Sequence, residues 1–291
     1  MRDATVGDAG DAGDASDAGL DGAQDGSRDA GDASVDASLD AEIPRGSRGM
    51  WMWQWTHVGD ATLEAALFDF ALSHDVGTLY VESEALVAIP DRLDAFLAAA
   101  NARGLEVELL FGNPEWARTE NHGELLDLIR AANGFSVRGV HLDVEPYLLA
   151  DWEPDPSVLG GQLLDLIAAV DAELVDDLEL SVDVPFWFDE ILVRGRPLSE
   201  SITDVADRLV VLAYRDDARA IEAVAAQELA YASSAGGSVV VAVETTCVEP
   251  ETITFCEEGA DALERALAEF DTAEPSFAGF AVHSYVAWRD L

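Results

Sequence analysis

The stretch Gly139-Val140-His141-Leu142-Asp143-Val144-Glu145-Pro146-Tyr147 alternates apolar and polar residues until the proline. In an extended strand, successive side chains point to opposite faces, so the valines and the leucine would share one face and the histidine and two acids the other. A polar row on a buried strand is costly unless its members are paired or have a function. Active sites of α/β barrels are assembled at the carboxyl ends of the strands. We therefore predict that Glu145 is a catalytic acid with Asp143 beside it.

Strand-like and helix-like segments alternate along the chain from Gly49 onward. Besides the opening stretch, short Val-rich strands are predicted over residues 50–55, 78–82, 106–111, 178–184, 208–214, 239–244 and 279–285. Helices with Leu and Ala at helical spacing are predicted over residues 62–73, 90–103, 122–133, 156–175, 218–235 and 259–270. This alternation predicts parallel strands joined by right-handed crossovers. Eight such strands favour an α/β fold closed into a single (β/α)8 TIM barrel, with a doubly wound open sheet as the alternative.

The first 45 residues differ in composition from the rest of the chain. Residues 1–45 repeat Gly-Asp-Ala and Asp-Ala-Ser units with almost no bulky apolar side chain. Such a segment cannot bury enough surface to offset chain entropy, so we predict a disordered acidic linker over 1–45 and a barrel domain over 46–291. A spacer between an anchor and an exported catalytic domain and an inert, solubilising tail fit this composition equally well.

The net charge of −42 restricts the possible partners. Residues 1–45 carry 12 acidic residues and three arginines, a charge of −9, so −33 lies on the remainder. This charge repels nucleic acid and anionic membranes, and we expect neither as a partner. No apolar run reaches the ~20 residues of a membrane span, and no apolar signal segment follows Met1. We expect a monomer that is secreted or tethered to the cell surface, with its signal or anchor outside this chain.

Cys247 and Cys256 are the only cysteines and flank a loop-like segment. A loop-closing disulfide in an oxidising compartment is the expected state, and two reduced cysteines in a cytosolic protein are the alternative. No histidine lies near them at zinc-site spacing, and no glycine-rich phosphate loop is present. We therefore predict neither a metal nor an organic cofactor.

Carboxylates and aromatic residues gather at the predicted carboxyl ends of the strands, which a barrel brings to one mouth. Aromatic faces suit the C–H face of a sugar ring, and carboxylates bind its hydroxyls, although a single tryptophan is more often a packing residue. The predicted carbohydrate-binding residues are Trp53, Trp55, Glu82, Asn113, Trp116, Tyr147, Asp183, Trp187, Arg215, Asp216, His283, Tyr285 and Trp288.

Asp143 and Glu145 point the same way two residues apart, so their proximity and partial burial should raise one pKa enough to hold a proton near neutral pH. The alternative is an internal salt bridge, for example to Arg215. His141 is expected to be a hydrogen-bonded core residue. His283 could be either a core residue or a residue of the site.

The segment Arg138-Gly-Val-His-Leu-Asp-Val-Glu145 resembles the fourth-strand motif of the family-18 chitinases and their barrel relatives, Asp-Gly-x-Asp-x-Asp-x-Glu. The resemblance implies that Glu145 is the general acid and that Asp143 orients a 2-acetamido group, which acts as the nucleophile. Val-Leu-Ala-Tyr-Arg-Asp looks like the family's Met-x-Tyr-Asp strand, which makes Tyr214 the acetamido-positioning tyrosine. Trp288 would match the tryptophan floor of the sugar subsite. The strand-end residues also resemble those of uncharacterised bacterial exported barrel proteins.

Two departures from the motif leave alternatives open. Arg138 and His141 occupy the positions of the family's first two aspartates, which a non-catalytic carbohydrate-binding barrel would also show. Glu145 and Glu244 end strands four and seven, as in retaining glycosidases, although Val144 stands where that clan has an asparagine. We predict a glycoside hydrolase acting on a polysaccharide or glycoconjugate, with Glu145, Asp143, Tyr214 and Glu244 as catalytic residues. The alternatives are the binding barrel, the retaining Glu145/Glu244 pair and an amidase.

Overall fold

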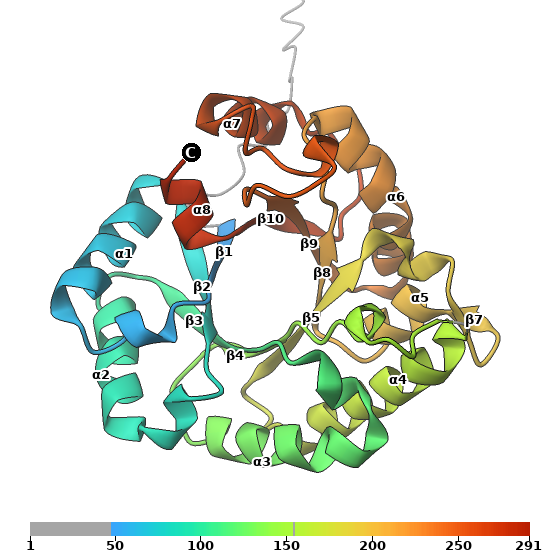
Figure 1. Cartoon of the computed structure of the whole chain (residues 1–291), viewed down its shortest axis with the longest axis horizontal. Coiled ribbons are helices and arrows are strands. Elements are labelled where there is room, and N and C mark those ends of the chain that lie inside the picture. The colour runs from blue at the N-terminus through green and yellow to red at the C-terminus, as the bar shows by residue number, and fades with distance from the viewer. Residues whose placement is uncertain (1–47, 154) are drawn as a thin grey trace, which may run out of the picture. The chain divides into compact units, whose positions relative to one another are not determined.

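The computed structural model describes residues 48–153 and 155–291. In this part of the chain, parallel strands close into a barrel in the order β1-β10-β9-β8-β5-β4-β3-β2, and helices surround it (Figure 1). The predicted (β/α)8 barrel is confirmed, and the alternative of an open sheet is wrong. The predicted disordered segment, 1–45, lies outside the described residues.

The barrel strands are β1 (Arg48–Met52), β2 (Val76–Glu82), β3 (Glu106–Phe111), β4 (Gly139–Leu142), β5 (Glu179–Pro185), β8 (Arg208–Leu212), β9 (Ser238–Glu244) and β10 (Phe277–His283). The helices are α1 (Ala61–Ser73), α2 (Pro90–Asn101), α3 (His122–Ala132), α4 (Pro156–Glu173), α5 (Leu198–Thr203), α6 (Ala218–Ala235), α7 (Ala260–Glu269) and α8 (Tyr285–Arg289). Short 3₁₀ turns follow several strands: η1 (Trp55–His57), η2 (Leu86–Ala88), η3 (Pro114–Ala117), η4 (Thr119–Asn121), η5 (Pro146–Leu148), η6 (Phe186–Asp189) and η7 (Glu251–Ile253).

Aspartates fix the starts of three helices. The side chains of Asp60, Asp155 and Asp217 accept hydrogen bonds from backbone N–H groups in the first turns of α1, α4 and α6. These N–H groups have no partner within the helix, so an acidic cap both satisfies them and complements the helix dipole. At its other end α6 stops at Gly236, whose φ of 79° suits a glycine cap.

The fold differs from the prediction at three places. After β5 the chain forms a small hairpin, β6 (Leu192–Val193) with β7 (Arg196–Pro197), and then the short helix α5. Strand β10 ends at His283, and Tyr285 begins α8 instead of ending a strand. Strand β4 ends at Leu142, so Asp143 and Glu145 lie just beyond the ladder, where Asp143 N–H still donates to the Phe111 carbonyl at 3.0 Å.

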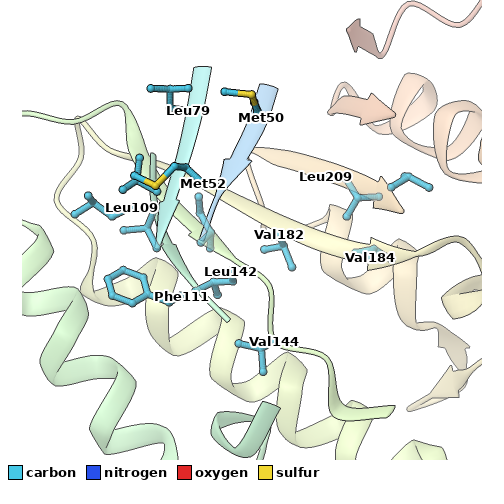
Figure 2. Close-up of a cluster of buried hydrophobic side chains, with 14 of the residues drawn as sticks. Met50, Met52, Leu79, Leu109, Phe111, Leu142, Val144, Val182, Val184 and Leu209 are labelled. Atoms are coloured by element: carbon cyan, nitrogen blue, oxygen red, sulfur yellow. The ribbon is translucent and has the colours of Figure 1, made fainter. Parts of the chain in front are cut away.

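The alternation within the opening stretch determines two separate cores. Leu142 and Val144 point outward into the layer between strands and helices, where they join Met52, Leu109 and Phe111 (Figure 2). Inside the barrel a smaller apolar cluster lies around the axis; it consists of Trp51, Tyr80, Leu110, Val210, Leu212, Val240, Ala242 and Ala281. His141 belongs to the same interior layer, since it pairs in register with Leu110 on one side and Ser181 on the other. The polar row of β4 therefore faces the barrel interior and leads to its mouth.

Cys247 and Cys256 form a disulfide in the loop between β9 and α7, which confirms their predicted pairing. Within the described ranges no helix is both long enough and apolar enough to cross a membrane.

Candidate active site

Four carboxylic acids lie at the carboxyl ends of β4, β5 and β9, and Tyr214 follows β8, the strand between β5 and β9 in the closed barrel (Figure 1). Burial, and then the negative charges of Glu244, Asp143, Asp183 and Glu145, raise the pKa of Tyr214 well above its usual value. We call Asp143, Glu145, Asp183 and Glu244 the acid cluster. Acids from three strands thus act on the pKa of one phenol, although Asp143 and Glu244 are more than 100 positions apart in the sequence.

Glu145 is half-buried at the end of the unpaired segment that leaves β4. Burial raises the pKa of its carboxyl; Asp183 and Glu244 raise it further, while a hydrogen bond from the Tyr147 hydroxyl and the nearby His283 act in the opposite direction. The net effect is a raised pKa. A carboxyl that is partly open to the mouth and holds its proton above the usual pH range has the properties of a general acid.

Asp143 lies deeper and is 9% exposed. Burial, and then the charges of Asp183 and Glu145, raise its pKa well above the usual value. Two adjacent carboxyls in a low-dielectric interior cannot both ionise at low cost. The raised pKa of Asp143 favours its protonated form.

The side chain of Glu244 is held in place by three hydrogen-bond partners. Its Oε1 accepts from the backbone N–H groups of Thr245 at 2.8 Å and Thr246 at 2.6 Å, and its Oε2 lies 2.9 Å from Nδ1 of His283. The indole N–H of Trp53 donates to Nε2 of His283 at 2.8 Å, so this histidine must carry its proton on Nδ1 and donate it to Glu244. The chain Trp53–His283–Glu244 thus fixes one wall of the mouth.

The opposite wall is aromatic. The Tyr147 ring lies 5.2 Å from that of Trp187, edge to face, and Trp187 packs in turn against Phe188 and Trp152. Tyr147 and Trp187 are half-buried, so each keeps part of a ring exposed, whereas Phe188 and Trp152 support them from beneath. Trp187 also borders a surface groove between η6 and α6 that Gln227 lines from the other side.

Among the described residues, five other predicted binding residues make no hydrogen bond or ion pair with the acid cluster. Arg215 donates to the Tyr214 carbonyl at 2.6 Å and lies over the Phe186 ring, so the alternative of a salt bridge from Arg215 to Asp143 or Glu145 is wrong. Asn113 caps η3 through Glu115 N–H. The remaining three, Glu82, Trp55 and Asp216, are partly exposed at the ends of β2, β1 and β8.

Three aromatic residues predicted to line the cleft are packing residues instead. Trp116 is 2% exposed and contacts Phe111 in the outer core. Tyr285 and Trp288, both on α8, pack against Phe70 of α1. The predictions for Trp116, Tyr285 and Trp288 are therefore wrong, because their rings face the helical layer and not the barrel axis. The subsite floor that the resemblance assigns to Trp288 is not formed by this residue.

His141 is a hydrogen-bonded interior residue, as predicted, but its partners were not foreseen. Its Nε2 lies 2.8 Å from Oδ1 of Asp183, and its Nδ1 lies 3.0 Å from Oε2 of Glu108 on β3. Arg208 approaches Glu108 from below at 3.1 Å. Glu108 could have been singled out in the sequence, because it is an acid at an inward position of an otherwise apolar strand.

Within the described residues, the one group of three with suitable spacing for a metal ion is Cys247, Cys256 and Glu257, and the disulfide occupies both sulfur atoms of this group.

No family model matches the chain, and no curated protein sequence does. Solved structures match its fold. A GH18 chitinase from Pseudoalteromonas aurantia superimposes with a TM-score of 0.53 at 13% identity, covering 82% of this chain and 93% of its own. The chain has the fold of a chitinase-type glycosidase.

Two further solved structures agree. An endo-β-N-acetylglucosaminidase from Cordyceps militaris gives a TM-score of 0.55 at 14% identity, with 82% of this chain and 81% of the other covered. A chitinase from Bacteroides thetaiotaomicron gives 0.52 at 12% identity, with 82% and 89% covered. The predicted resemblance to the family-18 chitinase-like barrels is thereby confirmed at the level of the fold, which is all that such identities show.

Proposed function

We propose that this protein is a glycoside hydrolase that cleaves a polysaccharide or glycoconjugate, with Glu145 as the general acid. The observation that carries the proposal is the position of Glu145: its half-buried carboxyl has a raised pKa and lies at the carboxyl-end mouth of the barrel, within electrostatic reach of Asp183 and Glu244. Glycosidic cleavage needs an acid that protonates the leaving oxygen, and its transition state is oxocarbenium-like and positively charged.

Other members of the acid cluster and three nearby aromatic residues supply what such a transition state and its substrate need. Glu244 is fixed by two backbone N–H groups and His283, so its carboxyl group is already oriented and requires no reorganisation during the reaction. The Tyr214 hydroxyl stays protonated and is available to donate to the substrate. Tyr147 and Trp187 present partly exposed rings on which a sugar can stack. Asp143, protonated, can donate a hydrogen bond toward the reacting sugar.

The proposal extends to the setting of the protein. The Cys247–Cys256 disulfide is characteristic of an oxidising compartment, and a polysaccharide substrate would be met outside the cell. We propose a secreted or surface-tethered enzyme that acts as a monomer.

The test compares the wild type with Glu145→Gln on chitin, galactosaminan, β-glucan and peptidoglycan fragments. Glu120→Gln, which changes an exposed glutamate on η4, is the matched control. We expect cleavage of at least one polymer by the wild type and the control, and a loss of about 10²–10⁴-fold in Glu145→Gln with binding retained. Binding by all three proteins with turnover by none would show a carbohydrate-binding barrel instead.

Both enzymatic alternatives retain the configuration of the sugar, and the nature of the intermediate separates them. Retention with a covalent intermediate that disappears in Glu244→Gln would support the Glu145/Glu244 pair. Retention that requires a 2-acetamido group on the substrate would support the arrangement implied by the family-18 resemblance. Release of an amine from peptidoglycan fragments without any new reducing end would show an amidase.

A further inference from the structure

The loop that follows β9 starts at the candidate active site. Strand β9 ends at Glu244, and residues 245–256, which we call the cystine loop, lead from there toward α7. Oε1 of Glu244 accepts from the N–H groups of Thr245, at 2.8 Å, and Thr246, at 2.6 Å, so this loop supplies both backbone donors to the carboxyl. Whatever fixes these two residues therefore also helps to fix the orientation of Glu244.

The two donor residues are anchored in different ways. The N–H and the hydroxyl of Thr245 both donate to the His283 carbonyl of β10, each at 2.7 Å, and Thr245 is 1% exposed. Thr246 is partly exposed and, among the described residues, makes no hydrogen bond to β10. Its carbonyl accepts instead from the Thr254 hydroxyl at 2.7 Å. The barrel thus fixes the first donor, whereas the cystine loop itself fixes the second.

Thr254 joins the two halves of the cystine loop through one buried hydroxyl. The residue is 0% exposed, and its hydroxyl donates to the Thr246 carbonyl while it accepts from the Cys256 N–H at 3.1 Å. A buried hydroxyl that both donates and accepts is satisfied in one direction only, so it holds its two partners in a defined relation. The hydroxyl therefore links Thr246, in the outgoing half, to Cys256, in the returning half.

The disulfide and Phe255 complete this base of the loop. Cys247 directly follows Thr246, and its disulfide partner Cys256 is the residue that donates to Thr254. Between them in the returning half, Phe255 donates its N–H to the Glu244 carbonyl at 3.0 Å and buries its ring in the outer core. Groups that orient a reactive side chain do so only if further contacts lock their own positions. Here the lock on Thr246 is one covalent bond and one buried hydroxyl.

We propose that Thr254, Cys247 and Cys256 are positioning residues for Glu244, because together they fix the Thr246 N–H that orients its carboxyl. The inference rests on the proposed function for its catalytic consequence alone. Opening the disulfide or removing the Thr254 hydroxyl leaves Thr245 anchored to β10 but frees the Thr246 peptide to rotate. The candidate active site then responds to thiol reductants, although neither cysteine belongs to the acid cluster.

Amide exchange of Thr245 and Thr246 tests the structural half of the proposal without turnover. The full chain is labelled with ¹⁵N-threonine, and the two NMR signals are assigned with Thr245→Ser and Thr246→Ser. Hydrogen exchange is compared in the wild type, in Thr254→Val and in the wild type treated with dithiothreitol, which converts the disulfide to two thiols and leaves as its own cyclic disulfide.

Exchange at Thr246 should become about 10-fold faster or more in Thr254→Val and in the reduced protein, because its N–H loses a fixed carboxyl acceptor. Thr245 should change little, and reoxidation should restore Thr246. Thr252→Val, at an exposed residue of η7 in the same loop, is the matched control and should change neither rate. An unchanged rate at Thr246 in the reduced protein, or equal acceleration of both amides, would overturn the proposal whether or not Thr254→Val folds.

Kinetics on a glycan that the wild type cleaves tests the catalytic half. Thr254→Val and the reduced wild type should each lose about 10-fold in kcat with little change in KM, since the substrate still binds and one reacting group is misoriented. Thr254→Ser, which keeps the hydroxyl, should restore kcat, and Thr252→Val should match the wild type. Full kcat in the reduced protein would overturn the proposal and leave the proposed function intact. Faster exchange at Thr246 in a protein that cleaves no glycan would refute the proposed function and support the positioning of Glu244.

Discussion

Replacing Glu228 by glutamine should stabilise the protein in a pH-dependent way. Glu228 lies on α6 and is 2% exposed, and neither of its carboxylate oxygens has a hydrogen-bond partner among the described residues. Burial, with Asp189 nearby, raises the pKa of Glu228 from 4.5 to about 8. Above that pH the folded protein must keep an uncompensated negative charge in its interior.

The sign of the effect follows from proton binding. Between pH 4.5 and about 8 the folded state holds a proton on Glu228 that the unfolded state has released, so the free energy of unfolding falls as the pH rises through this window. A shift of this size corresponds to about 5 kcal/mol at most. Helix α6 can relax and admit water around the charge, so we expect roughly 2–3 kcal/mol.

Urea unfolding of wild type and Glu228→Gln at pH 5, 7 and 9 measures this difference. The glutamine variant should gain roughly 2–3 kcal/mol at pH 9, equivalent to about 4–12 °C in Tm, and little at pH 5. Glu269→Gln, which removes an exposed acid at the end of α7, is the control and should change stability by less than about 0.5 kcal/mol at every pH. A gain that is the same at pH 5 and pH 9, or a loss at pH 9, would refute the argument.

Three further predictions concern the site, the loop and the core. Tyr147→Phe removes the hydrogen bond that lowers the pKa of Glu145, so the alkaline limb of the kcat/KM profile should move up by about 0.5–1 pH unit; a downward shift would contradict the assignment. Reducing the Cys247–Cys256 disulfide, or replacing both cysteines by serine, should lower the free energy of unfolding by about 2–3 kcal/mol, as urea titration can show; an unchanged midpoint would mean that the loop is held by its other contacts. Leu142→Ala should lower the free energy of unfolding by about 2–5 kcal/mol, because Leu142 is 0% exposed in the outer core. Leu148→Ala, at a residue that is 60% exposed, should lower it by less than about 1 kcal/mol. Equal losses in the two variants would argue against the outward orientation of Leu142.

The barrel could be predicted because its signals are local. Valine-rich strands followed by helices with capping aspartates recur along the chain, and alternation around Leu142 indicates which side chains face the interior. The position of the acid pair followed from the same alternation. Since parallel strands end at one mouth, Asp143 and Glu145 could be expected near Glu244 and Tyr214 before any coordinates were known.

What could not be predicted depends on where a strand stops and on contacts across the barrel. Strand β10 ends two residues earlier than expected, which moves Tyr285 and Trp288 from the mouth onto α8 and into contact with α1. Trp116 follows a strand end too, but the turn η3 directs its ring toward Phe111. The partners of His141 lie 33 and 42 positions away on β3 and β5, and only the register of the sheet brings them together.

The acid role of Glu145 is tested most directly with aryl glycosides that differ only in the acidity of the leaving phenol. A good leaving group needs no protonation, whereas a poor one depends on the general acid. Glu145→Gln should therefore lose about 10²–10⁴-fold in kcat/KM on substrates with poor leaving groups and little on those with the most acidic phenols. An equal loss on all of them, or none on any, would contradict the assignment of Glu145 as the acid.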